Sequence, residues 1–208
     1  GDKDRLRSVL QKAIRLSSYL VFPMMEILAG CAPALVTVLL TDKWSACVPY
    51  LQLGCLFFLF QPLQTMNWQA LKAMGEGACC LRLEVVKKVI CFGLLFASIP
   101  FGVMGIAIAS AASGFFSMIV NIVPVMRLLD YGIKDQIWDI AKPALVSSAC
   151  FLAMLLIGRA DLAPIALLMV QLMSGLLIYI LGSMVFKLDG FAVIRSELLS
   201  RKAGKNAE

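Results

Sequence analysis

Six apolar stretches alternate with short charged or turn-forming segments along the chain. They cover about residues 14–33, 46–71, 89–104, 105–126, 143–158 and 163–186. A helix needs roughly 20 apolar residues to cross the hydrocarbon core of a bilayer. The pattern therefore predicts an all-α fold, a polytopic transmembrane bundle of about six helices. A basic segment at 1–13 precedes the bundle, and a polar tail at 187–208, which we expect to be disordered, follows it.

The second stretch differs from the others because its later half is polar on one side. From residue 46 it carries no charged residue before Lys72, and Pro62 interrupts it. Proline removes a helical hydrogen bond, so we expect a kink or break near Pro62. At 100° per residue, six side chains fall within a sector of about 140°. They are Gln61, Gln64, Thr65, Trp68, Gln69 and Lys72.

This polar stripe should avoid lipid, because an unpaired amide in hydrocarbon costs free energy of the order of kcal/mol. Two interpretations are open. The stripe either makes ordinary contacts between helices or lines a wet transport path.

Basic residues are distributed unevenly over the connections. Five lie before or at the very start of the first stretch, four lie between the second and third, three between the fourth and fifth, and five follow the sixth. These make 17 of the 19, and the remaining two, Lys43 and Arg159, belong to the other side. Because cytoplasmic loops are rich in Lys and Arg, we expect six spans with both ends of this segment in the cytoplasm. The net charge of +6 is then a topology signal, and no nucleic acid partner is expected.

The connections themselves have recognisable signals. Pro100–Gly102 predicts a tight turn, and the residues 34–40 form either the outer end of the first span or a short interfacial helix. Residues 128–141 mix apolar and charged side chains, as interfacial segments do. The fourth stretch carries small residues at intervals of four, which predicts a central helix with close neighbours. Cys79 and Cys80 are placed in a turn after the second span.

Composition excludes most enzyme classes. The chain is 61% hydrophobic and only 15% charged, with a mean hydropathy of +0.88, which indicates an integral membrane protein. The absence of histidine removes Ser-His and Cys-His catalysis and most zinc sites. No GxxxxGK[ST] loop is present, and the seven cysteines show no metal-ligand spacing. We therefore expect no enzyme activity, no cofactor and no metal site.

Glu26 is the one acidic residue that we place inside a span. A carboxylate near the middle of a bilayer costs at least about 2.5 kcal/mol. It lies three residues after Pro23, whose missing N–H would free backbone carbonyls nearby. Glu26 is either a cation-coupling residue in a polar cavity or a hydrogen-bonded structural residue near the edge of the membrane.

Two runs of sequence resemble a known family. LLTDKWSACVPYLQL and PLQTMNWQALKAMGEGACCLRLEVVKK are similar to bacterial lipopolysaccharide O-antigen and exopolysaccharide flippases. The matching features are an acidic-Lys-Trp turn, two prolines and a polar run, namely Asp42, Lys43, Trp44, Pro49, Pro62, Leu63, Asn67, Gln69, Leu71, Lys72, Ala73 and Gly75. The flippases belong to the polysaccharide-transporter family of the multidrug, oligosaccharidyl-lipid and polysaccharide exporter superfamily.

The resemblance implies a transporter of twelve or fourteen helices, of which this chain would be the C-terminal half. The whole protein would move an undecaprenyl-diphosphate-linked oligosaccharide across the bacterial inner membrane. Its partners would be that lipid-linked oligosaccharide, membrane lipids and the missing N-terminal half. Lys72 is a candidate for a cationic mouth that receives the diphosphate, or else a lysine that snorkels to the interface. No family pattern assigns a role to Glu26.

Two other functions are open. A cation-coupled multidrug exporter of the same superfamily would share the architecture. A membrane partner in polysaccharide synthesis, without transport activity of its own, is the second. A polymerase or acyltransferase would need large outer loops or a catalytic His/Asp set, and the predicted outer loops are short.

Overall fold

The computed structural model describes residues 2–160, 162–186, 188 and 190, and this part of the chain is helical with no strand. The elements are α1 (Asp2–Gly30), α2 (Ala32–Leu40), the 3₁₀ helix η1 (Asp42–Cys47), α3 (Val48–Leu59), α4 (Gln61–Ala73), α5 (Gly77–Ser98), the 3₁₀ helix η2 (Ile99–Phe101), α6 (Gly102–Leu129), α7 (Ile133–Ile157) and α8 (Pro164–Val185). The predicted all-α fold is confirmed.

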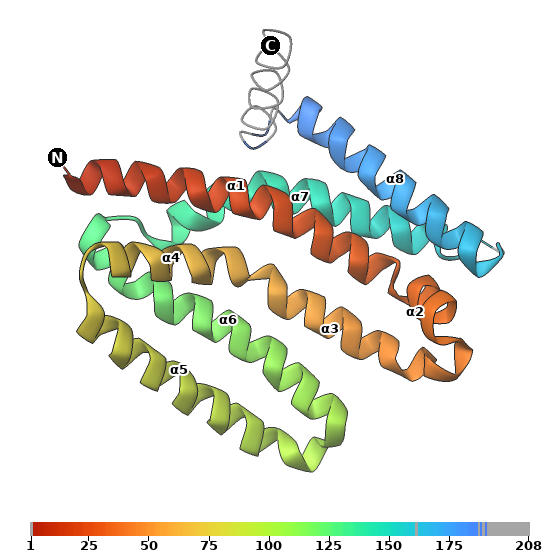
Figure 1. Ribbon diagram of the computed structural model, residues 1–208, viewed down its shortest axis with the longest axis horizontal. Helices are drawn as coiled ribbons and strands as arrows, with labels where there is room; N and C mark the ends of the chain where they lie inside the picture. Colours follow the sequence, from red (N-terminus) through yellow and green to blue (C-terminus); the bar gives the residue numbers. More distant parts are fainter. Residues whose placement is uncertain (1, 161, 187, 189, 191–208) are drawn as a thin grey trace, which may run out of the picture.

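The long helices lie side by side in an order that differs from their order in the chain. In Figure 1, α6 lies between α5 and the pair α3–α4, and α1 lies between that pair and α7, with α8 beyond α7. The bundle thus has α5 and α8 at its margins. The helices α1, α3–α4, α6 and α7 surround the interior.

Five apolar stretches in the described residues are long enough to cross a membrane. The third, Gly77–Leu129, contains both α5 and α6, which turn back on each other at η2. The second, Asp42–Ala73, contains η1, α3 and α4. Counted as passes along the bundle, these stretches provide six, and the tight turn expected at Pro100–Gly102 is confirmed.

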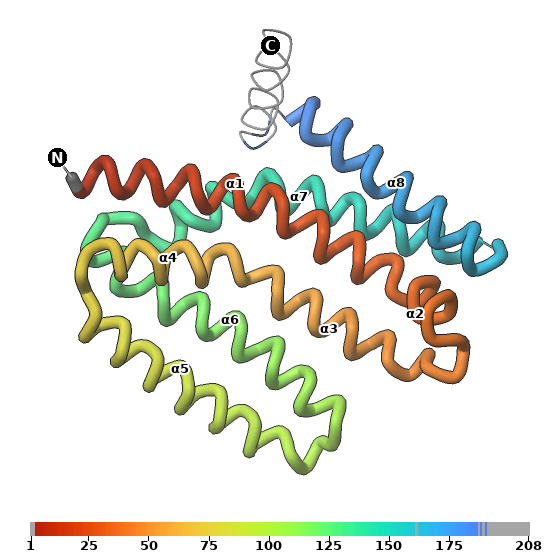
Figure 2. The backbone as a smooth tube through the Cα atoms, in the orientation of Figure 1, coloured from red at the N-terminus to blue at the C-terminus, as the bar shows by residue number. Residues whose placement is uncertain are grey.

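Prolines set the two main breaks. The helix stops at Leu59 and restarts at Gln61, with Pro62 in the first turn of α4, where its missing N–H is harmless. Figure 2 shows the change of direction between α3 and α4, so the break expected near Pro62 is confirmed. In the same way α1 ends at Gly30, and Pro33 lies in the first turn of α2. Residues 34–40 therefore belong to a short separate helix.

Small residues bring α6 close to its neighbours, as predicted for a central helix. A Cβ built on Gly114 would lie 2.6 Å from the ring of Phe57 on α3, so only glycine fits there without a shift of the neighbour. Ala111 and Ser113 on the same helix are buried. The spacing therefore serves helix packing.

The main hydrophobic core lies at one end of the bundle, around the α4–α5 and α6–α7 turns. Its members come from α1, α4, α5, α6 and the loop after α6, and are Leu10, Ile14, Leu63, Ala70, Leu71, Cys80, Met118, Ile122, Val125, Leu129 and Tyr131. Elsewhere many large apolar side chains are exposed, for example Phe92, Phe96 and Leu176. Such a surface suits a lipid environment.

Several boundaries differ from the sequence expectation. The basic segment 1–13 is, from Asp2, part of α1, and residues 133–141 are the opening turns of α7. Cys79 and Cys80 lie in the first turn of α5 and not in the turn between helices that the sequence predicts. Two ion pairs join these segments, Arg7 with Asp135 and Arg15 with Asp139, whereas Lys3, Arg5, Lys12 and Lys134 are exposed. The expected disordered tail lies outside the described residues except for residues 188 and 190.

The connections sort by charge between the two ends of the bundle. The start of α1 and the α4–α5 and α6–α7 turns lie together at the left of Figure 1. The α2–η1 segment with Lys43 and the α7–α8 turn with Arg159 lie at the opposite end. The described Lys and Arg residues that we assign to the cytoplasmic side thus lie toward the same end of the bundle, the end with the start of α1.

Candidate functional site

The polar stripe of α4 is divided between the interior and the surface of the bundle. Gln64 points inward, where its side-chain amide donates to the carbonyl oxygen of Gly114 at 3.0 Å. Asn121 on α6 donates in turn to the backbone carbonyl of Gln64 at 3.2 Å. Gln61 and Trp68 are half-buried. This part of the stripe makes the ordinary contacts between helices that the sequence left open as one interpretation.

The outward part of the stripe consists of Thr65, Gln69 and Lys72, which are all exposed. They follow one another at intervals of four and three residues, so they form one face of α4. Neither Thr65 nor Gln69 hydrogen-bonds another described residue through its side chain. These three polar residues on an apolar span form what we call the polar face of α4.

A buried amide pair holds α4 against α7, and the predicted stripe did not include it. Asn67 Nδ2 donates to Gln136 Oε1 at 2.7 Å, and Gln136 Nε2 donates to Asn67 Oδ1 at 3.0 Å. Both residues are fully enclosed. The signal available in the sequence was a single Asn in the apolar run and a single Gln in the mixed segment, but nothing in their spacing joins them.

Trp68 packs toward α5 and contacts two lysines. The Nζ of Lys72 lies 5.6 Å from the centroid of the indole, and the Nζ of Lys87 lies 4.4 Å from it. Both distances are within the range of a cation–π interaction. Lys87 comes from α5 and was not among the predicted site residues.

Glu26 lies in a cleft of about 540 Å³ between α1, α3, α6 and α7. Most of the lining is apolar, and its polar side chains are Glu26, Gln52 and Ser148. Ser148 Oγ donates to Glu26 Oε1 at 3.4 Å, whereas Glu26 Oε2 is enclosed without a hydrogen-bond partner among the described residues. The structure does not bring Glu26 together with the polar face of α4, which lies on a different part of the bundle.

The sequence predicts that Pro23 leaves free backbone carbonyls near Glu26, and the structure differs from this expectation. The helix α1 continues through Pro23, and the carbonyl of Tyr19 that Pro23 leaves free accepts a hydrogen bond from Tyr179. In the cleft itself, Gln52 Nε2 donates at 3.1 Å to the carbonyl of Ala29. That carbonyl lies four residues before a proline, so it too lacks its usual helical donor. The free carbonyl expected beside Glu26 is therefore already taken.

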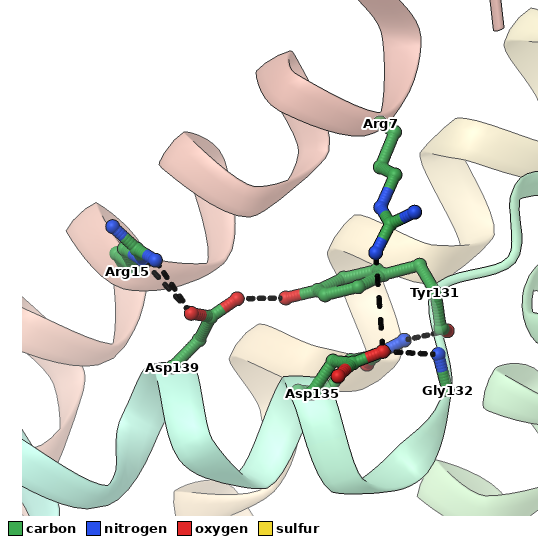
Figure 3. Close-up of polar contacts among 7 residues, drawn as sticks. Arg7, Arg15, Tyr131, Gly132, Asp135 and Asp139 are labelled. Atoms are coloured by element: carbon green, nitrogen blue, oxygen red, sulfur yellow. Dashed lines mark hydrogen bonds and ion pairs between the residues drawn. The ribbon is translucent and has the colours of Figure 1, made fainter. Parts of the chain in front are cut away.

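Charges at the core end of the bundle join α1 to α7. Arg15 donates through two nitrogens to Asp139 Oδ1, at 2.7 and 3.0 Å, and the Tyr131 hydroxyl donates to Asp139 Oδ2 at 2.5 Å (Figure 3). One turn earlier, Asp135 accepts from the backbone N–H of Gly132 at 3.2 Å and lies 4.0 Å from Arg7.

Tyr131 lies at the centre of this cluster and is fully buried. Burial and the hydrogen bond to Asp139 raise the pKa of the Tyr131 phenol well above its ordinary value. The group therefore stays protonated and donates to the carboxylate. The arrangement serves a structural role, because both carboxylate oxygens of Asp139 and the hydroxyl of Tyr131 are bound to groups of the chain.

No three His, Cys, Asp or Glu side chains gather into a possible metal site in the described part of the chain. The cysteines, including Cys79 and Cys80, are free thiols.

A comparison with known families gives one match. The family described as polysaccharide biosynthesis protein matches residues 1–49, which contain α1, α2, η1 and the start of α3. No curated protein and no solved structure matches the chain. The family match and the apolar helices support a multi-pass membrane protein with a role in polysaccharide synthesis or export.

Proposed function

We propose that this chain is the helical half of a transporter that moves an undecaprenyl-diphosphate-linked oligosaccharide across the bacterial inner membrane. The repeat unit would belong to an O-antigen or an exopolysaccharide. The match at residues 1–49 supports a role in polysaccharide synthesis or export, and a bundle of spanning helices is the architecture that a transporter needs. The chain would have no catalytic activity of its own.

The polar face of α4 is the observation that carries the proposal. Thr65, Gln69 and Lys72 are exposed on a helix within an apolar stretch long enough to span the membrane. Leaving two uncharged polar groups and an ammonium in lipid is unfavourable. A second helical bundle, the proposed N-terminal half, would enclose this face and leave a wet route beside it. The sugar headgroup would pass along that route while the lipid tail stays in hydrocarbon.

The proposed orientation places the core end of the bundle in the cytoplasm. The start of α1 and the α4–α5 and α6–α7 connections carry most of the described basic residues at that end, in agreement with the positive-inside rule. Lys72 then lies at the cytoplasmic mouth of the polar face. A lipid-linked diphosphate made in the cytoplasm would meet this lysine first.

A cation-coupled multidrug exporter is the second candidate, and the cleft around Glu26 favours it. An enclosed carboxylate oxygen without a donor can bind a proton or a cation, and the apolar lining would suit a hydrophobic drug. A flippase could use the same carboxylate for coupling. The exporter and the flippase therefore differ in the molecule that they transport, a hydrophobic drug or a lipid-linked oligosaccharide.

Deletion of the gene that encodes this chain tests the proposal. We expect loss of surface polysaccharide and accumulation of lipid-linked repeat units on the inner leaflet. A gene with Thr65→Val, Gln69→Leu and Lys72→Met should fail to restore export. The matched control, Val85→Leu with Val89→Leu on the exposed apolar face of α5, should restore it. Unchanged polysaccharide together with lost drug resistance would refute the flippase and support the exporter.

A further inference from the structure

One side of α7 changes character along the helix. Seven side chains lie within a sector of about 80°, at 100° per residue, and we call them the outer face of α7. From the start of the helix they are Lys134, Trp138, Lys142, Leu145, Ala149, Leu152 and Leu156, and all seven are exposed. The outer face is therefore basic and aromatic over the first turns of α7 and apolar over the rest.

The apolar part of the outer face suits contact with lipid chains. Leu145, Leu152 and Leu156 are each at least 60% exposed, and they belong to Ile133–Ile157, a stretch long and apolar enough to cross a membrane. Apolar side chains on the surface of a spanning helix are favourable where the surroundings are hydrocarbon. This part of the outer face is thus the lipid-facing side of α7.

Trp138 lies where the apolar part gives way to the basic part. Its side chain is 80% exposed, which would leave a large apolar ring in water if the surroundings were aqueous. An indole is favoured at the interface between membrane and water, because its ring is apolar and its N–H is polar. From Trp138 to Ile157 the helix rises about 29 Å, close to the roughly 30 Å of a hydrocarbon core.

Two lysines flank the indole on the same face. Lys134 lies one turn before Trp138 and Lys142 one turn after it, and both are exposed. Neither lysine forms an ion pair within the described part of the chain. Two positive charges thus lie beside the indole and point out of the bundle.

The acidic residues of the same turns do not neutralise these lysines. Asp139 is bound by Arg15, and Asp135 lies 4.0 Å from Arg7, so both carboxylates are engaged by α1. The opening turns of α7 therefore present their negative charges to α1 and their positive charges to the outside.

We propose that Lys134, Trp138 and Lys142 form a binding surface for anionic phospholipid. The indole lies at the level of the lipid ester groups, and the two ammonium groups contact headgroup phosphates. Two observations select a lipid over a protein partner. The surface is continuous with the lipid-facing side of a spanning helix, and its unpaired positive charges are complementary to anionic headgroups. This contact sets the depth of α7 in the membrane.

The depth of Trp138 tests the first part of the proposal. Trp44→Phe and Trp68→Phe leave Trp138 as the single tryptophan of the full chain, which is reconstituted in vesicles of phosphatidylcholine and phosphatidylglycerol. We expect lipids brominated near the ester groups to quench Trp138 more strongly than lipids brominated near the terminal methyl. A matched chain with Trp138→Phe and Leu152→Trp should show the opposite order.

Two results of the depth measurement would overturn the proposal. Quenching of Trp138 by acrylamide, without quenching by either brominated lipid, would place it in water. No quenching by brominated lipid or acrylamide would place it under a protein, either a partner or a second copy of the chain.

The preference for an anionic headgroup tests the second part. We expect brominated phosphatidylglycerol to quench Trp138 at about a fivefold lower mole fraction than brominated phosphatidylcholine, the factor that one lysine contributes near an anionic surface. High salt should reduce this preference. The double variant Lys134→Gln, Lys142→Gln should lose it, whereas Lys134→Arg, Lys142→Arg should keep it.

A control of equal charge is available on the opposite margin of the bundle. Arg82 and Lys88 are exposed on α5, and Arg82→Gln with Lys88→Gln should leave the preference unchanged. Helical circular dichroism verifies that each variant is folded. Equal quenching by the two lipids, or the same preference in the Lys134→Gln, Lys142→Gln variant, would overturn the anionic site.

Discussion

The hydroxyl of Tyr179 on α8 donates a 2.6 Å hydrogen bond to the backbone carbonyl of Tyr19 on α1. Pro23 lies four residues after Tyr19, so this carbonyl has no helical donor of its own. The two rings also contact each other, with centroids 5.2 Å apart. The phenol of Tyr179 thus binds the backbone carbonyl that Pro23 leaves without a helical donor. This contact fixes α8 to the middle of α1.

We expect Tyr179→Phe to lower the free energy of unfolding by about 1 kcal/mol, because the ring contact is kept and one buried hydrogen bond is lost. Thermal unfolding in detergent measures the change. The control is Tyr50→Phe, since the Tyr50 side chain is only half-buried and forms no hydrogen bond with another described residue. Equal stability of the two variants would show that the carbonyl of Tyr19 does not need the phenol.

The amide pair of Asn67 and Gln136 should show strong coupling in a double-mutant cycle. Asn67→Leu or Gln136→Leu alone leaves a buried amide without its partner, and we expect each to cost about 1–3 kcal/mol of unfolding free energy. The double variant removes both amides and should cost less than the two single changes together. Strict additivity would mean that the pair contributes no interaction between α4 and α7.

We expect the protein to lose stability in alkali, because the Tyr131 phenol holds its proton more tightly in the folded protein than in the unfolded chain. In the unfolded chain a phenol loses its proton near pH 10, whereas burial and Asp139 raise the pKa of Tyr131 in the folded protein. The unfolded state then binds fewer protons, so the free energy of unfolding should fall as the pH rises above about 10. Tyr131→Phe removes this contribution. The slope of stability against pH should be steeper for the unmodified protein than for the variant, and parallel curves would contradict the prediction.

The polar face of α4 should be reachable by water. After replacement of the native cysteines, Thr65→Cys and Gln69→Cys should react with a membrane-impermeant maleimide in inverted vesicles or after the transporter opens outward. Phe92→Cys, on the exposed apolar face of α5, is the control and should stay unreactive. If Thr65 and Gln69 were as unreactive as Phe92 in every condition, α4 would lie against lipid and the transport path would have to be elsewhere.

Glu26→Gln tests the coupling role of the cleft. The amide keeps the size of the side chain and can still bond to Ser148, but it cannot exchange a proton or a cation. We expect slower transport that no longer depends on pH. Glu76→Gln, outside the spanning helices, is the control. Transport with an unchanged rate and pH dependence would assign Glu26 a purely structural role.

Hydropathy and local covalent chemistry determined much of the architecture. The apolar stretches predicted the helical bundle, because the cost of exposing backbone groups to lipid leaves few alternatives to a helix. Pro62 predicted the break that separates α3 from α4, since a missing N–H acts within one turn of its own position. The small residues of the fourth stretch predicted the close contact at Gly114.

Only the tertiary structure decided which polar groups meet. The sequence predicts that the mixed segment 128–141 is interfacial, but the fold turns Asp135 and Asp139 toward Arg7 and Arg15 on α1. Lys87, which the sequence placed in a loop, is on a helix and lies against Trp68. The stripe on α4 likewise divides into Gln64 inside and Gln69 outside. Such pairings depend on the rotation of each helix about its axis, and that rotation is set by packing against neighbours far away in the chain.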